Sequence, residues 1–208
     1  MRWEECVGSY RAIVSLGSTC QTAYQLNRLG LRRTSGPIDW FVTRSVPGLL
    51  QLLARRFEGL MDFPHLQVVG LTGEALTVRD SRYDIVSFHD FPLGPPPFVL
   101  RDAYPALRAQ VDRRVQRFLR TLQLRPVLLV RTDTSPADAH QLHAAVSRLA
   151  SASPRLLIVN THTDGNPGPV QEDWRLDGIC GVRVPPGTDW RGNDAAWAAV
   201  MRGFSVSP

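Results

Sequence analysis

The stretch AIVSLGSTCQTAYQLNRLG, residues 12–30, decides the fold because it joins a buried strand to a helix through one tight turn. Ala12 to Leu16 is a short apolar run with two β-branched residues, which predicts a buried strand. Gly17 ends that run, and Cys20 to Leu29 then carries apolar residues at helical spacing. Gly30 is suited to cap the end of the helix. The chain therefore opens with a strand–turn–helix unit, which is typical of α/β folds.

The same alternation of apolar strands and amphipathic helices returns in the second half of the chain. Strands are predicted at Asp84–Phe88, Val127–Val130, Leu156–Val159 and Val182–Val184, and helices at Val46–Phe57, Pro105–Leu122, Ser135–Ala150 and Asn193–Gly203. His65–Asp80 is predicted to form a β-hairpin, and Phe91–Pro97 a proline-rich loop. Because the strands are continuously apolar, we expect a mostly parallel sheet with helices on both faces. No linker interrupts the pattern, which predicts a single α/β domain over residues 1–208.

Charge and hydropathy disfavour two classes of partner. The formal net charge is +5, and the 24 basic residues are all arginines. Such a bias reflects coding composition more often than a nucleic-acid surface, and a basic balance alone is only an electrostatic footprint. The arginines are scattered, apart from Arg113, Arg114, Arg117 and Arg120 on one predicted helix. No apolar run approaches the roughly 20 residues of a membrane span. We expect a small-molecule or peptide substrate and neither a nucleic acid nor a membrane, and the oligomeric state is left open.

The cysteines and histidines predict a free thiol and no cofactor. Cys6, Cys20 and Cys180 are odd in number and widely spaced, which argues against a disulfide framework and against a zinc site. The N-terminus does not read as a signal peptide, so a cytoplasmic location is expected. His140 and His143 lie three apart on a predicted helix, but no third ligand accompanies them, and no metal is expected. No GxGxxG or Walker sequence indicates a nucleotide cofactor.

Polar residues follow the carboxyl ends of the predicted strands, where ligands bind in open parallel sheets. Cys20 lies just past the first strand and His89 ends the strand at residues 84–88. Arg131 and Asp133 follow the next strand, and Asn160 follows the one after it. If these strands are parallel neighbours, the side chains share one edge of the sheet.

Cys20 is the best candidate nucleophile, with His89 as its base. The first helical turn has unpaired N–H groups and the positive end of the helix dipole, and both favour a thiolate. The same amides could hold an oxyanion. His89 could take the thiol proton and return it to a leaving group. Asp90, Asp39 and Asp133 compete for the role of the group that orients the imidazole, and Asp90 requires the chain to have left the strand by that point.

Four of these polar residues are candidates for substrate binding. Asp39 is part of a glycine–proline turn beside Trp40, where it either walls a pocket or stabilises the turn. Arg131 can clamp a carboxylate or phosphate through its planar fork, or form a structural ion pair. Asp133 and Asn160 complete the predicted substrate-binding set.

Several segments together resemble a known family. SLGSTCQTAYQLNRLGLRRTSGPIDWF, residues 15–41, is similar to the signature of DUF1796, whose members are described as papain-like cysteine peptidases. Shorter matches follow in order: FHDFP, RRVQRF, LLVR, IVN and DWRGNDAAW, at residues 88–92, 113–118, 128–131, 158–160 and 189–197. The resemblance implies a cysteine nucleophile, Cys20, and a histidine partner, His89. It also implies a papain-like α+β fold as the alternative to a parallel sheet. No glutamine precedes Cys20 closely enough to build the usual papain-like oxyanion hole.

Two hypotheses follow. The first is a cysteine-dependent hydrolase or acyltransferase of the peptidase or amidase type, in which Cys20 attacks an acyl carbon and His89 moves the proton. The second is a non-catalytic or transfer-type domain that binds a polar metabolite, such as a sugar or nucleotide, through Arg131, Asn160 and Asp39.

Overall fold

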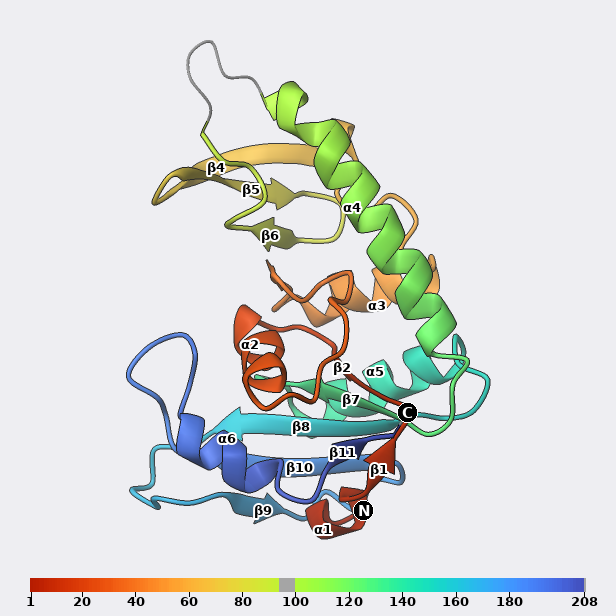
Figure 1. The fold of residues 1–208 in the computed structure, drawn as a ribbon, viewed down its shortest axis with the longest axis vertical. Helices are drawn as coiled ribbons and strands as arrows, with labels where there is room; N and C mark the ends of the chain where they lie inside the picture. Colours follow the sequence, from red (N-terminus) through yellow and green to blue (C-terminus); the bar gives the residue numbers. More distant parts are fainter. Residues whose placement is uncertain (94–99, 208) are drawn as a thin grey trace.

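The computed structural model describes residues 1–93 and 100–207, and these form a mixed α/β fold with several sheets (Figure 1). The helices are α1 (Trp3–Cys6), α2 (Cys20–Arg28), α3 (Val46–Ala54), α4 (Leu100–Thr121), α5 (Pro136–Ser147) and α6 (Asp194–Val200), with a short 3-10 helix at Phe63–His65. The strands are β1 (Ser9–Tyr10), β2 (Ala12–Ser15), β3 (Phe41–Val42), β4 (Leu66–Thr72), β5 (Ala75–Asp80), β6 (Ile85–Ser87), β7 (Val127–Arg131), β8 (Arg155–Thr161), β9 (Val170–Glu172), β10 (Ile179–Val184) and β11 (Ser205–Val206).

A five-stranded sheet in the order β2-β7-β8-β10-β9 carries the strand–turn–helix unit. β2, β7, β8 and β10 are parallel neighbours, and β9 is an antiparallel edge strand. Alternate residues of β7 enter separate cores: Leu128 and Val130 pack on the side of α2 and α6, whereas Val127 and Leu129 pack on the side of α3 and α5. Helices therefore cover both faces of this sheet, which explains why its strands are apolar throughout.

A second, four-stranded sheet is antiparallel, in the order β3-β6-β5-β4. The predicted strand that ends near His89 is β6, and it belongs to this sheet rather than to the parallel one. Residues 81–84 alone connect β5 to β6, whereas a parallel crossover needs a dozen or more residues. The expectation of one mostly parallel sheet is therefore not confirmed, because one main sheet is mixed and the other is antiparallel.

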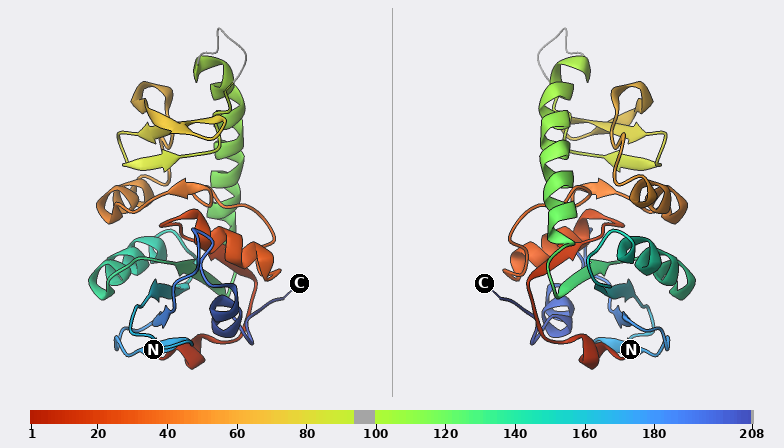
Figure 2. Two further views of the ribbon diagram at one scale, coloured as in Figure 1. Left: turned by 90° about the vertical axis from the view of Figure 1, so that its left-hand side faces the viewer. Right: turned by 90° about the vertical axis from the view of Figure 1, so that its right-hand side faces the viewer.

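Helix α4 runs alongside the antiparallel sheet and reaches down to the five-stranded one (Figures 1 and 2). It buries a stripe formed by Leu107, Val111 and Phe118. The helix begins at Leu100, so Pro105 lies inside it rather than at its start as predicted. Within the predicted proline-rich loop, residues 94–97 lie outside the described part of the chain.

The first and last strands, β1 and β11, pair in parallel beside the five-stranded sheet, and a disulfide joins α1 to β10. Cys6, in α1, pairs with Cys180, in β10, with Cα atoms 6.8 Å apart. This pair corrects the expectation, drawn from the number and spacing of the cysteines, that there is no disulfide framework; the two residues are 174 positions apart and nothing local marks them. Disulfides are commoner in oxidising compartments than in the reducing one expected from the sequence. Among the described helices, none is long and apolar enough to cross a membrane.

Candidate functional site

The turn between β2 and α2 has a left-handed backbone that places Cys20 at the start of the helix. Gly17 and Ser18 have φ angles of 77° and 76°. A Cβ atom on Gly17 would overlap the hydroxyl of Thr43, so glycine is required there for space as well as for conformation. Ser18 donates its backbone N–H to that hydroxyl at 2.9 Å, and Thr19 caps α2 by accepting from the Gln21 amide. The turn is held from both sides before the helix begins.

Cys20 is the first residue of α2 and the free cysteine of the chain, because Cys6 and Cys180 are paired. Its side chain is only 8% exposed. Burial raises the pKa of the Cys20 thiol to about 11, with further increases from the charges of Asp90 and Asp39. The Cys20 amide lowers that pKa, as expected at a helix start, but burial outweighs it. Cys20 is therefore a neutral thiol near neutral pH, which corrects the thiolate expected from its place at the start of the helix.

The antiparallel sheet places Asp90 close enough to Cys20 for its charge to raise the pKa of the thiol. Thr43 follows β3 and donates its backbone N–H to the Ser18 carbonyl at 2.8 Å, and β3 pairs with β6, which ends at Ser87. The Ser87 hydroxyl donates to the Asp90 carboxylate at 2.6 Å. The chain has thus left the strand before Asp90, so the condition for Asp90 to help orient His89 is met. Its role as the orienting group stays a prediction.

His89 lies next to Asp90, and its side chain is exposed. The imidazole ring lies 6.5 Å from the Phe88 ring, centre to centre. Among the described residues, none forms a hydrogen bond or an ion pair with the imidazole. The role of His89 as the base stays a prediction.

Asp39 is fully buried and lies near the Cys20 sulfur. It forms an ion pair with Arg32 and accepts the Gly36 amide at 2.8 Å through the same oxygen. Its other oxygen, Oδ1, is buried without a hydrogen-bond partner among the described residues. Burial raises the pKa of Asp39, although the Gly36 amide and Arg32 oppose the increase. The Arg32 guanidinium also lies over the Trp40 ring, so a cation packs against the predicted wall of the pocket.

Arg131 is fully buried at the end of β7, and its donors are used by the protein itself. It donates to the carbonyls of Leu16 and Thr43 at 2.8 and 2.7 Å, and to the hydroxyls of Thr43 and Thr134 at 3.2 and 3.0 Å. Burial lowers the pKa of Arg131 to about 10. Arg131 thus joins the end of β2 to the segment after β3, an arrangement that differs from a ligand clamp.

Asp133 and Asn160 also support the Cys20 turn. The exposed Asp133 carboxylate accepts the Ser18 hydroxyl at 3.0 Å. Asn160 pairs with the backbone of Thr134, accepting its amide at 3.0 Å and donating to its carbonyl at 2.9 Å. The parallel strands β2, β7 and β8 therefore bring these residues to one edge of the sheet, where they hold one another. Their role in substrate binding stays a prediction.

One residue that sequence reasoning did not place at this site is Arg114 of α4. Its positive charge acts on both Asp90 and Asp39, the two carboxylates that raise the Cys20 pKa. Burial and the neighbouring Arg117 and Arg32 lower the pKa of Arg114 itself. The run of arginines on α4 was visible in the sequence, but its orientation toward the cysteine depends on how α4 packs.

The described residues include no set of side chains grouped to bind a metal ion. Within residues 1–93 and 100–207, no group of three or more His, Cys, Asp and Glu side chains is placed to hold an ion. The two histidines of α5 lie apart from the cysteine, and His143 contacts the Pro154 carbonyl at 2.8 Å.

Comparison with known proteins identifies the family. The family described as "Putative papain-like cysteine peptidase (DUF1796)" matches residues 11–162, so the chain belongs to this family. An uncharacterized protein, R408 of Acanthamoeba polyphaga mimivirus, is 36% identical over 55 residues, which are 26% of this chain and 25% of the viral protein. The chain thus spans about a quarter of the length of that relative. No solved structure matches. The region that matches the family, residues 11–162, contains Cys20, His89 and Asp90.

Proposed function

We propose that the protein is a cysteine-dependent hydrolase or acyltransferase whose nucleophile is Cys20. The observation that carries the proposal is the position of Cys20: it is the chain's free thiol, at the first turn of α2, beyond the carboxyl end of a parallel strand. That end of a sheet is where α/β proteins bind ligands. Membership of a family described in terms of a cysteine peptidase supports the same chemistry.

Because the pKa of Cys20 is raised, the thiol needs a base to remove its proton. A thiol with a pKa of about 11 is almost entirely protonated near neutral pH, so the proton has to leave as the sulfur attacks. We assign its removal to His89, the exposed neighbour in sequence of Asp90, whose charge acts on the Cys20 thiol. The sulfur–carbon bond forms, the leaving group departs with the proton from His89, and a thioester on Cys20 remains. Water or an amine then takes the acyl group.

The backbone amides of the turn restrict where an oxyanion can lie. The amides of Ser18 and Gln21 already donate to the hydroxyls of Thr43 and Thr19. The Cys20 amide lies close enough to the Cys20 sulfur to lower the pKa of the thiol. A donor in that position faces the carbon that the sulfur attacks, as the nucleophile's own amide does in serine proteases. We therefore assign the oxyanion to the Cys20 amide.

The four predicted substrate-binding residues at this edge of the sheet have two different roles. Asp133 is exposed, so it is placed to contact a substrate, whereas the fully buried Asp39 acts through Arg32 and the Gly36 amide that it binds. Arg131 and Asn160 act through the backbone segments that they hold in place, as positioning residues.

A specific observation also favours the second candidate, a binding domain without catalysis. The high pKa of Cys20 is what a cysteine with only a packing role would have. In that case Cys20→Ser leaves ligand binding unchanged, and Cys20 reacts more slowly than a free thiol.

Acylation by p-nitrophenyl acetate separates the two candidates. Near neutral pH, an enzyme transfers the acetyl group to Cys20 faster than to free N-acetylcysteine, and releases p-nitrophenolate. Intact mass spectrometry without reductant detects a single acetyl group, and Cys20→Ala lacks it. Acetylation slower than that of N-acetylcysteine would refute the catalytic proposal.

The His89→Gln variant tests the base. Near neutral pH its acylation rate should fall by about a hundredfold, the contribution of a well-placed general base. Near pH 11 the thiolate forms without help, so the variant should approach the wild-type rate. His65→Gln, at a histidine in the short helix before β4, is the matched control. An equal loss at both pH values would indicate a structural role for His89 instead.

A further inference from the structure

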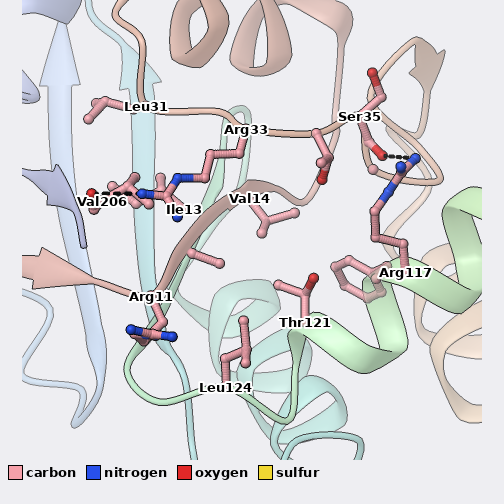
Figure 3. Close-up of a pocket in the computed structure, with 14 residues that line it drawn as sticks. Arg11, Ile13, Val14, Leu31, Arg33, Ser35, Arg117, Thr121, Leu124 and Val206 are labelled. Atoms are coloured by element: carbon pink, nitrogen blue, oxygen red, sulfur yellow. Dashed lines mark hydrogen bonds between the residues drawn. The ribbon is translucent and has the colours of Figure 1, made fainter. Parts of the chain in front are cut away.

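A cavity of about 220 Å³ lies against β2, the edge strand of the five-stranded sheet (Figure 3). Its floor is apolar and includes Ile13, Val14 and Leu124. Figure 3 shows Arg33 extending toward Val206 and Arg117 extending toward Ser35, on opposite sides of it. The cavity thus combines an apolar interior with cations at its margin.

A second hollow of about 360 Å³ continues from the first. Arg33, Thr34, Ser35 and Arg117 line both spaces. Its remaining lining comes from Gln110, Arg113 and Arg114. We call the four arginines at residues 33, 113, 114 and 117, together with Thr34 and Ser35, the arginine groove. Among the described residues that line either space, none is Asp or Glu.

Most of the hydrogen-bonding capacity of the groove is unused. Arg113 is exposed and makes no hydrogen bond or ion pair with a residue that the structure describes. Arg117 donates to the Ser35 carbonyl at 3.4 Å, and its buried Nε–H has no partner among the described residues. Arg33 donates to the Val206 carbonyl at 3.3 Å. Each guanidinium carries five N–H donors in a planar fork that matches an oxyanion, so many donors remain.

The grouped like charges also favour an anion. Arg117 and Arg32 both lower the pKa of Arg114, which shows that the guanidinium groups repel one another. Asp39 and Asp90 compensate Arg114 from the Cys20 side, but none of the described residues that line the groove carries a carboxylate side chain. An anion bound there would relieve the repulsion and use the free donors.

We propose that the arginine groove binds an oxyanion, a phosphate or a carboxylate, whose apolar part enters the cavity beside β2. Thr34 and Ser35 line the same hollow, and their hydroxyls are further hydrogen-bond donors for the oxyanion. The proposal does not use the chemistry of Cys20. A Cys20→Ala protein should therefore bind the same ligands as the wild type, which keeps this test separate from the test of catalysis.

Calorimetric titration of the full chain at low ionic strength tests the proposal with four probes: octyl phosphate, octanoate, inorganic phosphate and octyltrimethylammonium. Octyl phosphate or octanoate should bind, and the tighter of the two identifies the oxyanion as phosphate or carboxylate. Inorganic phosphate should bind more weakly because it lacks the apolar part. Octyltrimethylammonium has the same tail and the opposite charge, and it should not bind.

Variants on one helix locate the site. Arg113→Met and Arg117→Met should each weaken binding of the preferred probe by about tenfold, the loss of a charge-assisted hydrogen bond. Arg120→Met, on α4 but outside the groove, should leave the affinity unchanged. Arg113 is exposed, so its variant remains informative if Arg117→Met does not fold. Equal affinity in the wild type and Arg113→Met, equal binding of inorganic and octyl phosphate, or binding of octyltrimethylammonium would overturn the proposal.

Discussion

The Cys20 turn and the arginine groove use the same side chain, arginine, in opposite ways. At the turn, Arg131 is buried and donates to the backbone and hydroxyls around it, and Arg32 is paired with Asp39. In the groove, most N–H donors of Arg113 and Arg117 have no hydrogen-bond partner among the described residues. Burial and partners, rather than residue type, therefore distinguish an arginine that holds the fold from one that can hold a ligand.

The largest expected effect of this difference is on stability. Arg131→Met leaves the carbonyls of Leu16 and Thr43 buried without their donor, which should lower the free energy of unfolding by about 3 kcal/mol or more. Arg113→Met should change it by less than about 0.5 kcal/mol, because that side chain is exposed. Urea unfolding of both variants measures the difference. Similar losses in the two would remove the distinction between the regions.

A smaller effect is expected on the thiol from Asp90→Asn. A carboxylate near a thiol opposes formation of the thiolate, so removing its charge should lower the pKa of Cys20 from about 11. Alkylation by iodoacetamide at a mildly alkaline pH should then be several-fold faster than in the wild type. Asp84→Asn, at an exposed aspartate just before β6, is the control. A slower rate in Asp90→Asn would show that this carboxylate does not oppose ionisation of Cys20.

The smallest effect should come from Arg114→Gln, because Arg114 lies between the two regions. Removing its charge leaves Asp39 and Asp90 less compensated, so the pKa of Cys20 should rise slightly. The affinity for the preferred anionic probe should fall a few-fold in the same variant. Alkylation rates and calorimetry measure the two effects. A change in neither would mean that the thiol and the groove are electrostatically independent.

Local patterns predicted the part of the fold that positions Cys20. The apolar run before Gly17 and the capping residue Thr19 specify strand β2 and helix α2 through sterics and hydrogen bonding that act within a few residues. The hairpin of β4 and β5, and helix α5 with its first-turn Pro136, were predictable for the same reason.

Features that depend on distant residues were not predictable. An apolar strand such as β6 reads alike in a parallel or an antiparallel sheet; its short connection to β5, which excludes the former, was already present in the sequence and could have corrected that prediction. Arg131 reads alike whether its fork faces a ligand or the carbonyl of Leu16, 115 positions away. Cys6 and Cys180 carry no local sign of their pairing.

The pH dependence of Cys20 alkylation tests the central claim, that burial keeps the Cys20 thiol neutral near neutral pH. The measurement is the rate of carboxamidomethylation of the full chain by iodoacetamide, with the Cys6–Cys180 disulfide intact. We expect an apparent pKa of about 11 for Cys20. A value at or below about 8.5, that of an ordinary thiol, would show that burial does not raise the pKa of Cys20 and would contradict the account.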